Sequence, residues 1–99
     1  MIHIVAILTA QPGQREALLT RFKAAVPAVQ AEDGCLDYAP VIDLDSSPLK
    51  FGEDCVVVIE KWRDQAALDA HGKGAALQSF VADTKDVLAK LDVYLLQNA

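Results

Sequence analysis

Three side chains that could carry chemistry lie close together in the sequence. Glu60 and Trp62 follow the strongly apolar segment Cys55–Ile59, and His71 follows in a segment with helical periodicity. A carboxylate can hold a proton, an imidazole can transfer one near neutral pH, and an indole can stack on a flat aromatic ligand. The sequence therefore predicts a small enzyme-like pocket at the junction of a strand and a helix.

Residue spacing indicates how these side chains are oriented. Glu60 and Trp62 should share one face of their strand, because strand side chains alternate with a period of two. His71 follows Ala67 by four residues and Leu68 by three, so it falls on the apolar stripe of the expected helix and should point toward the strand. We therefore predict that His71 transfers protons and that Trp62 and Glu60 contact the substrate.

Two further residues are candidates for the same site. His3 lies in the first apolar segment and is a second candidate for proton transfer, although a dimer contact or a place on the sheet surface fits it equally well. Tyr38 could orient a substrate hydroxyl, or could lie at a subunit interface, where tyrosine is enriched. Each residue taken singly also has a structural interpretation, because a lone histidine on an apolar stripe or a strand tryptophan is more often a core residue.

Composition limits the class of protein. The 99 residues fit a single domain, residues 1–99, with a core of modest size. Because 53% of the residues are hydrophobic, a second subunit is expected to cover one face. The net charge of -5 argues against nucleic acid and anionic membranes as partners. The first residues show no targeting or membrane-spanning pattern, so the expected location is the cytoplasm.

Hydrophobic periodicity gives the expected order of elements. It predicts strands at 1–9, 35–43, 55–62 and 91–97, and helices at 14–32, 65–71 and 75–90. Pro27 should kink or split the first helix, and Pro40 favours an edge position for the second strand. This β-α-β-β-α-β order is the ferredoxin-like α+β arrangement, a four-stranded antiparallel sheet with helices on one face. Sheet-to-sheet dimerisation would cover the open face, and the long loop 44–54 would be a pocket wall or a surface excursion.

No cofactor signature is present. Gly72-Lys73-Gly74 has neither the spacing of a phosphate-binding loop nor a strand before it. The two histidines and scattered carboxylates form no metal-ligand spacing. Cys35 and Cys55 should begin opposite ends of an antiparallel pair, about 25 Å apart, so we expect both to be reduced. The expectation is a protein without a bound nucleotide, flavin or metal.

Several of these residues occur together in a pattern typical of one family. The pattern comprises Glu60-x-Trp62, then Ala67-Leu68-x-x-His71 and Phe80, with Gly34-Cys35-x-x-Tyr38 at the start of the second strand. With the chain length and element order, it resembles the antibiotic biosynthesis monooxygenase family over essentially the whole chain. That family's haem-degrading branch has an Asn in the first strand. The corresponding place falls near Ala6 and the only Asn is Asn98, so haem degradation is not expected.

The resemblance implies a dimeric α/β barrel and an oxidation reaction that uses dioxygen. Members of the family include small monooxygenases that oxidise quinols or polycyclic aromatic phenols with dioxygen and no prosthetic group, the deprotonated substrate itself reducing oxygen. By this resemblance the protein would supply binding, a base and a dry pocket. His71 or His3 would be the base, Trp62 the aromatic wall and Tyr38 a hydroxyl contact.

Two other functions fit the same residues. An isomerase of a small hydroxy-carbonyl metabolite could use His71 and Glu60 to move a proton, and a small-molecule binding protein would need no turnover. Fold resemblance alone does not choose among these. The size of the cavity does, because a cavity too small for a fused ring system would favour the isomerase.

Overall fold

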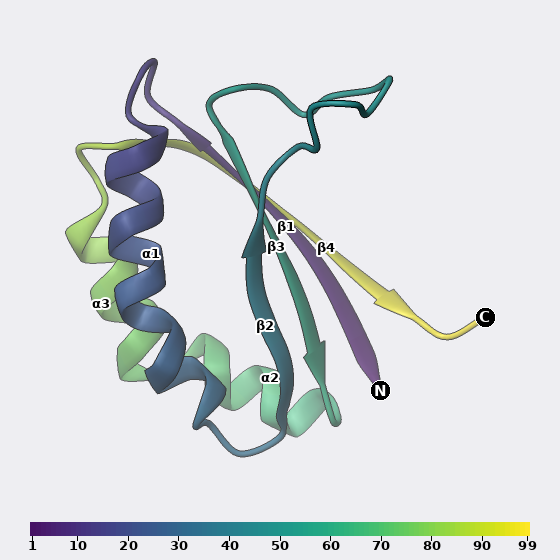
Figure 1. The fold of residues 1–99 in the computed structure, drawn as a ribbon. Helices are drawn as coiled ribbons and strands as arrows, with labels where there is room; N and C mark the ends of the chain where they lie inside the picture. The colour runs from purple at the N-terminus through teal and green to yellow at the C-terminus, as the bar shows by residue number, and fades with distance from the viewer.

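The computed structural model describes residues 1–99 as four strands and three helices. In chain order these are β1 (Ile2–Ala10), α1 (Arg15–Gln30), β2 (Cys35–Val41), β3 (Cys55–Trp62), α2 (Gln65–Gly72), α3 (Ala75–Asp83) and β4 (Leu88–Gln97). The strands form one antiparallel sheet in the order β2-β3-β1-β4. All three helices lie on one side of it (Figure 1). The predicted ferredoxin-like α+β fold is confirmed.

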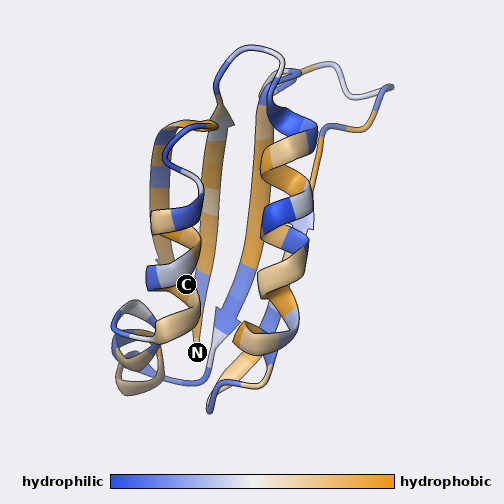
Figure 2. Cartoon of the chain, turned by 90° about the vertical axis from the view of Figure 1, so that its left-hand side faces the viewer, coloured by the Kyte–Doolittle hydropathy of each residue, from blue (hydrophilic) through white to orange (hydrophobic).

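The strand β1 lies at the centre of the sheet, as predicted. Ile4, Ala6 and Leu8 are buried beneath the helices, and the side chains between them point to the opposite face. In the register, Ile4 lies between Glu60 of β3 and Leu95 of β4. The apolar strands behind α1 and α3 form the floor of the helix-covered side (Figure 2).

The predicted boundary between the last helix and the last strand was wrong. The helix expected at 75–90 ends at Asp83, because the Thr84 hydroxyl donates to the Phe80 carbonyl at 2.7 Å and the chain turns there. Val87 and Leu88 continue the helical spacing but belong to the sheet side of this turn. The Gln11 backbone N–H donates to the Val87 carbonyl at 2.7 Å, and the Val87 side chain is buried. The apolar residues Val87 and Leu88 fit the stripe of a continuing helix and the start of a strand equally well, so the sequence pattern did not show where the helix ends.

Pro40 lies in an edge strand as predicted, whereas Pro27 does not split its helix. Pro40 lies in the edge strand β2, as expected. Pro27 lies inside α1, which continues past it to Gln30. The helix is neither split nor extended to residue 32. The Pro27 carbonyl accepts a hydrogen bond from the Ala31 backbone N–H, and the Val29 carbonyl accepts one from Glu32.

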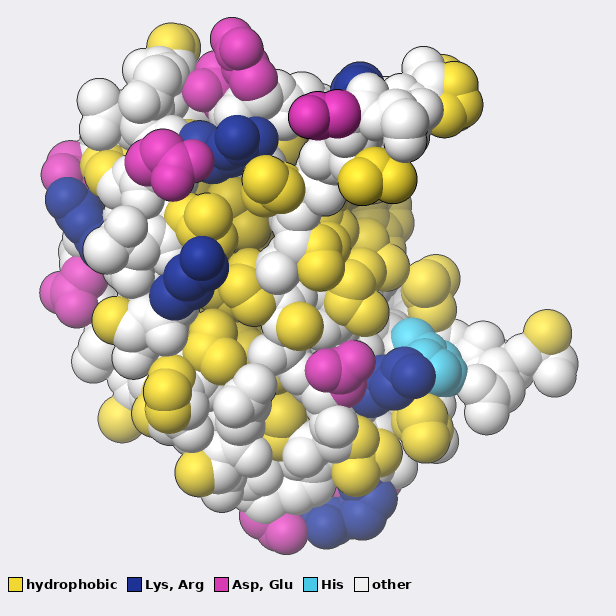
Figure 3. All heavy atoms as spheres, in the orientation of Figure 1, with side chains coloured by type: hydrophobic (Ala, Val, Ile, Leu, Met, Phe, Trp, Pro, Cys, Tyr) yellow, Lys and Arg dark blue, Asp and Glu magenta, His cyan; other side chains and the backbone are white.

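The face of the sheet opposite the helices is apolar and without a cover. Its central side chains come from all four strands: Val5, Ile7, Val41, Val57, Ile59, Tyr94 and Leu96. Hydrophobic side chains also gather along the strands and around the projecting β2–β3 loop (Figure 3). No helix in the structure combines the length and the hydropathy needed to cross a bilayer.

Gly34 marks the closest approach between the start of β2 and the start of α2. Its φ is +81°, and a Cβ atom at this position would overlap the Cβ atom of Ala67. The Gly34 carbonyl accepts a hydrogen bond from the Arg63 backbone N–H at 2.8 Å. Only glycine permits both this backbone conformation and this contact.

We predict that Gly34→Ala destabilises the protein by more than Gly13→Ala. Gly13 has a similar φ of +76°, but nothing lies within 4 Å of a Cβ placed there. Backbone strain alone should therefore cost about 1 kcal/mol at Gly13, whereas Gly34→Ala should cost at least about twice that because α2 must also move. Urea unfolding of both variants measures the difference. Equal losses would show that the contact with Ala67 does not constrain the fold.

Candidate active site

A cavity of about 620 Å³ lies between the sheet and the helices α2 and α3. We call it the front cavity. Fourteen of its 20 lining residues are hydrophobic, among them Ala6 and Val58 of the sheet and Leu68 and Phe80 of the helices. Its size and apolar lining are typical of a site for a small organic molecule. On the β4 side its wall is exposed, because no helix covers Val93.

Three polar residues from three different elements meet in this lining. Tyr38 of β2 lies opposite Glu60 of β3 in the sheet register, and His71 of α2 lies above them. Each of the three is only 6% exposed. The rings of Tyr38 and His71 meet edge to face, with centroids 5.7 Å apart. The sequence predicted a small pocket at the junction of β3 and α2, and in the structure these three residues line one cavity.

His71 is held in place from two sides. Its Nδ1 lies 2.7 Å from Oε1 of Glu32, and its ring stacks on that of Trp62, with centroids 4.5 Å apart and an angle of 29°. Because a carboxylate accepts, neutral His71 carries its proton on Nδ1 and the lone pair is on Nε2. Every side-chain nitrogen or oxygen atom that is buried has a hydrogen-bond partner. Nε2 of His71 has no such partner, so it is not among the buried atoms and is accessible. It can accept a proton from a ligand.

Glu60 has one oxygen engaged and one free. Oε1 accepts the indole N–H of Trp62 at 3.0 Å, while Oε2 has no protein partner and is accessible. Burial raises the pKa of the Glu60 carboxyl above its usual value, and the Trp62 hydrogen bond and nearby His71 offset this only in part. The carboxyl group therefore keeps its proton to a higher pH than an exposed glutamate does, and it can donate or accept at the cavity wall.

Tyr38 presents a neutral phenol. Burial is the main cause that raises its pKa, and the charges of Glu60 and Glu32 add to it. Its ring stacks on Phe22 of α1, with centroids 5.4 Å apart. The hydroxyl oxygen has no protein partner and is therefore accessible. It can donate to, or accept from, a hydroxyl group of a ligand.

Trp62 is not on the cavity wall predicted for it, and His3 takes the sheet-surface position that the sequence allowed beside proton transfer. Trp62 is fully buried and does not line the front cavity, because its indole lies behind His71 and not on a facing wall. His3 lies on the opposite face of the sheet, and its Nε2 is 2.6 Å from Oδ1 of Asn98. The period of two explains this, since Ile2 and Ile4 of β1 face the helices and His3 between them does not. The loop 44–54 also lies outside the cavity lining.

Glu32 is the functional residue that sequence reasoning missed. It lies 39 residues before its partner His71, just after α1, where the sequence predicted only the end of a helix. Neither periodicity nor spacing relates the two positions. Their contact depends on how closely the α1–β2 connection approaches α2, which only the tertiary structure shows.

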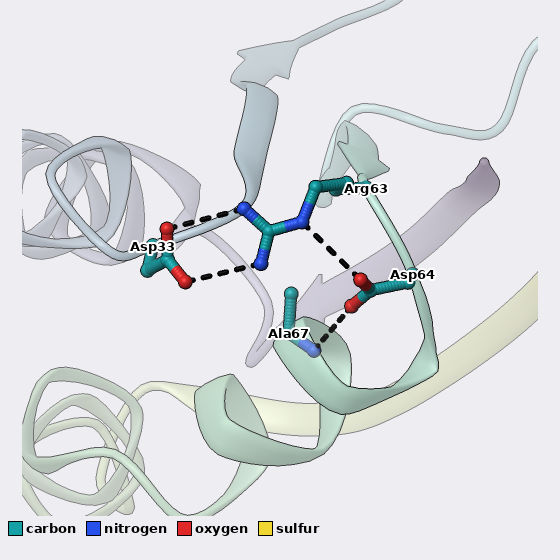
Figure 4. A network of polar contacts seen from close by, with 4 residues as sticks. All are labelled: Asp33, Arg63, Asp64 and Ala67. Carbon is teal, nitrogen blue, oxygen red and sulfur yellow. Dashed lines mark hydrogen bonds and ion pairs between the residues drawn. The ribbon is translucent and has the colours of Figure 1, made fainter.

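A network of polar contacts fixes that approach (Figure 4). The guanidinium of Arg63 donates to both oxygens of Asp33, at 3.1 and 3.0 Å, and to Asp64 at 3.2 Å. Asp64 in turn accepts from the Ala67 backbone N–H at 2.9 Å and caps α2. These bonds lower the pKa of the Asp33 and Asp64 carboxyls. The pairs are exposed and stabilise the fold little, but they join the segment bearing Glu32 to the helix bearing His71.

No three His, Cys, Asp or Glu side chains lie close enough together to hold a metal ion. The thiols of Cys35 and Cys55 are free. The two residues lie at opposite ends of the sheet, where Cys35 is opposite Trp62 and Cys55 is opposite Thr9 in the register.

The chain is similar to known proteins over almost its whole length. The family model described as "Antibiotic biosynthesis monooxygenase" matches residues 1–83. The chain belongs to the antibiotic biosynthesis monooxygenase family. The predicted resemblance is thereby confirmed.

Three relatives of this family member illustrate the likeness. The "Probable quinol monooxygenase YgiN" of Escherichia coli (strain K12) is 32% identical over 101 residues, covering 98% of this chain and 97% of YgiN. The "Putative monooxygenase YcnE" of Bacillus subtilis (strain 168) is 38% identical over 95 residues, covering 94% and 93%. The crystal structure of PA3566 from Pseudomonas aeruginosa superposes with a TM-score of 0.84 at 30% identity, covering 99% and 93%.

We predict that Glu60→Gln stabilises the protein at neutral pH and has less effect in acid. The glutamine can keep the bond to Trp62 without a buried charge. Since the folded-state pKa of Glu60 is raised, ionisation costs stability as the pH rises from the unfolded pKa, near 4.5, through the folded one. The nearby His71 lowers the pKa of this carboxyl and the charge of Glu32 raises it. Thermal unfolding of wild type and Glu60→Gln at pH 4 and pH 7 measures this stabilisation. An equal gain in stability at both pH values would contradict the prediction.

Proposed function

We propose that this protein is a cofactor-independent monooxygenase that oxidises a quinol-like or polycyclic aromatic substrate with dioxygen. The observation that carries the proposal is the free Nε2 of His71, backed by Glu32, at the wall of an apolar cavity. The name of YgiN, a probable quinol monooxygenase, supports the substrate class.

In this proposal His71 is the base. Its Nε2 takes the proton of a phenolic hydroxyl, and the Glu32 carboxylate stabilises the resulting imidazolium. The phenolate is a stronger reductant than the phenol and transfers electrons to dioxygen directly. Apolar walls exclude water that would otherwise stabilise the anion. Tyr38 and Glu60, whose free oxygens reach the same cavity, orient the substrate oxygens.

The dimensions of the front cavity favour an aromatic substrate. About 620 Å³ falls in the middle of the range for sites that hold drug-sized ligands, and it exceeds what a small hydroxy-carbonyl molecule needs. Trp62 contributes indirectly, by supporting the ring of His71 and binding Glu60. The aromatic contacts with the substrate fall to Phe80 and Tyr38, which line the cavity.

One observation keeps the isomerase as a second candidate. Glu60, with its raised pKa, and His71 line the same cavity and could serve as an acid–base pair. Solvent deuterium incorporated into a small keto sugar would indicate this reaction, and saturable binding without turnover would indicate a binding protein.

We also propose a homodimer formed through the open sheet face, acting in the cytoplasm. The apolar side chains on that face, including Val41, Tyr94 and Leu96, are 43–54% exposed in a single chain. A second copy would remove them from water. Sedimentation should then give twice the chain mass of 10.7 kDa.

The enzymatic test compares the two histidines. With a panel of hydroquinones, His71→Ala should lower the rate of oxygen uptake by about 100-fold or more, as expected for loss of a general base. His3→Ala is the matched control and should keep the wild-type rate, because His3 lies on the other face of the sheet. Trp62→Phe should have an intermediate effect, since it keeps a ring behind His71 but loses the bond to Glu60. Equal, negligible rates for all of these proteins would refute the proposed function.

A further inference from the structure

A second hollow, of about 500 Å³, lies on the other side of α2. We call it the rear hollow. It is bounded by the end of α1, the outer face of α2 and the start of α3, and most of its lining is alanine or glycine. His71 is the single residue that lines both the rear hollow and the front cavity. His71 therefore borders two spaces that otherwise share no residue.

Glu32 belongs to the rear hollow alone. Its side chain is 23% exposed and is absent from the lining of the front cavity. Oε1 is bonded to Nδ1 of His71, while Oε2 lies next to Gly74, where an added Cβ would be 3.4 Å away. Oε2 has no protein partner and is therefore accessible. This carboxylate is therefore open to the rear hollow.

The charged groups around the rear hollow leave Glu32 available. Asp33 and Arg63 line the rim, but they bind each other through two hydrogen bonds, and Arg63 also binds Asp64. No Lys or Arg side chain pairs with Glu32, whose partner is His71. From the cavity side, Glu60 and Tyr38 are the titratable groups nearest His71. Glu32 is thus the group between the imidazole and rear solvent.

We propose that the rear hollow is the proton outlet of the site, with Glu32 as the residue that passes the proton to water. This proposal rests on the proposed function. In it the substrate O–H bond breaks and an N–H bond forms at Nε2. The N–H bond at Nδ1 then breaks, an O–H bond forms on Glu32, and water in the rear hollow takes that proton. No electrons move in these steps. These steps leave His71 neutral with its proton on Nε2. That proton passes to the reduced dioxygen in the front cavity, and water in the rear hollow returns a proton through Glu32 to Nδ1, so the starting tautomer is restored and Nε2 is free again.

Chemical rescue tests the outlet. Glu32→Ala should lower kcat for oxygen uptake by about 10- to 100-fold, the usual cost of removing a carboxylate that orients a histidine. Formate, added as the probe, should fit the space left by the side chain and restore kcat in a saturable way with little change in KM. Formate should not restore His71→Ala, which lacks the base itself.

A second variant shows where formate enters. Ala70 is exposed and lines only the rear hollow, so Ala70→Leu should fill the hollow without changing the front cavity. Glu32→Ala combined with Ala70→Leu should then lose the rescue. Rescue that persists in the double variant, or Glu32→Ala with wild-type kcat, would overturn the proposal. So would an impaired Glu32→Ala that formate does not restore.

One further measurement separates this proposal from the proposed function. If the wild-type protein consumes no oxygen with any hydroquinone, the proposed function fails. Nitrogen-15 NMR of His71 then tests, without turnover, whether formate reaches His71 through the rear hollow. Formate should shift the His71 signals of Glu32→Ala in a saturable way and should not shift those of the double variant. Identical shifts in both variants would overturn the outlet even without turnover.

Discussion

The hydrogen bond between Glu32 and His71 is the interaction on which the geometry of the site depends. It joins the connection after α1 to the helix α2 and fixes which nitrogen of the imidazole carries the proton. With Trp62 stacked on the same ring, it leaves Nε2 as the nitrogen available to a ligand. A histidine with either contact missing could rotate or change tautomer, and a base at the cavity wall would then be present for only part of the time.

The fold provides this hydrogen bond through a close backbone approach. Gly34 lets the start of β2 lie against Ala67, and the contacts of Arg63 hold the two segments together. The ion pairs of Arg63 are exposed, so they add little to the stability of the whole protein. These contacts instead fix the position of α2. A shift of the helix by about 1 Å would break the hydrogen bond between Nδ1 of His71 and the Glu32 carboxylate. Bulk stability comes instead from the apolar residues between β1, β3 and α1, such as Leu18 and Val58.

Periodicity in the sequence was enough to predict the fold, and it placed Glu60, Trp62 and His71 near one junction, with Tyr38 as a further candidate for the same site. It could not say which strand face meets the helices, because Glu60 and Trp62 share a face whichever way the strand is turned. It therefore placed Trp62 on a cavity wall, whereas full burial puts it behind His71, and it kept His3 as a candidate although β1 turns it to the far side. Glu32 was missed for a different reason, since a contact across 39 residues has no signature in local spacing.

The most direct test of this account is the tautomer of His71 in the free protein. Long-range proton–nitrogen NMR distinguishes the protonated nitrogen of a neutral imidazole from the one bearing the lone pair. We expect His71 to carry its proton on Nδ1, and a bound redox-inert phenol such as 2-naphthol to shift the Nε2 signal. A proton on Nε2, or an Nε2 signal that saturating phenol leaves unchanged, would contradict the central claim that Glu32 holds His71 as a base facing the front cavity.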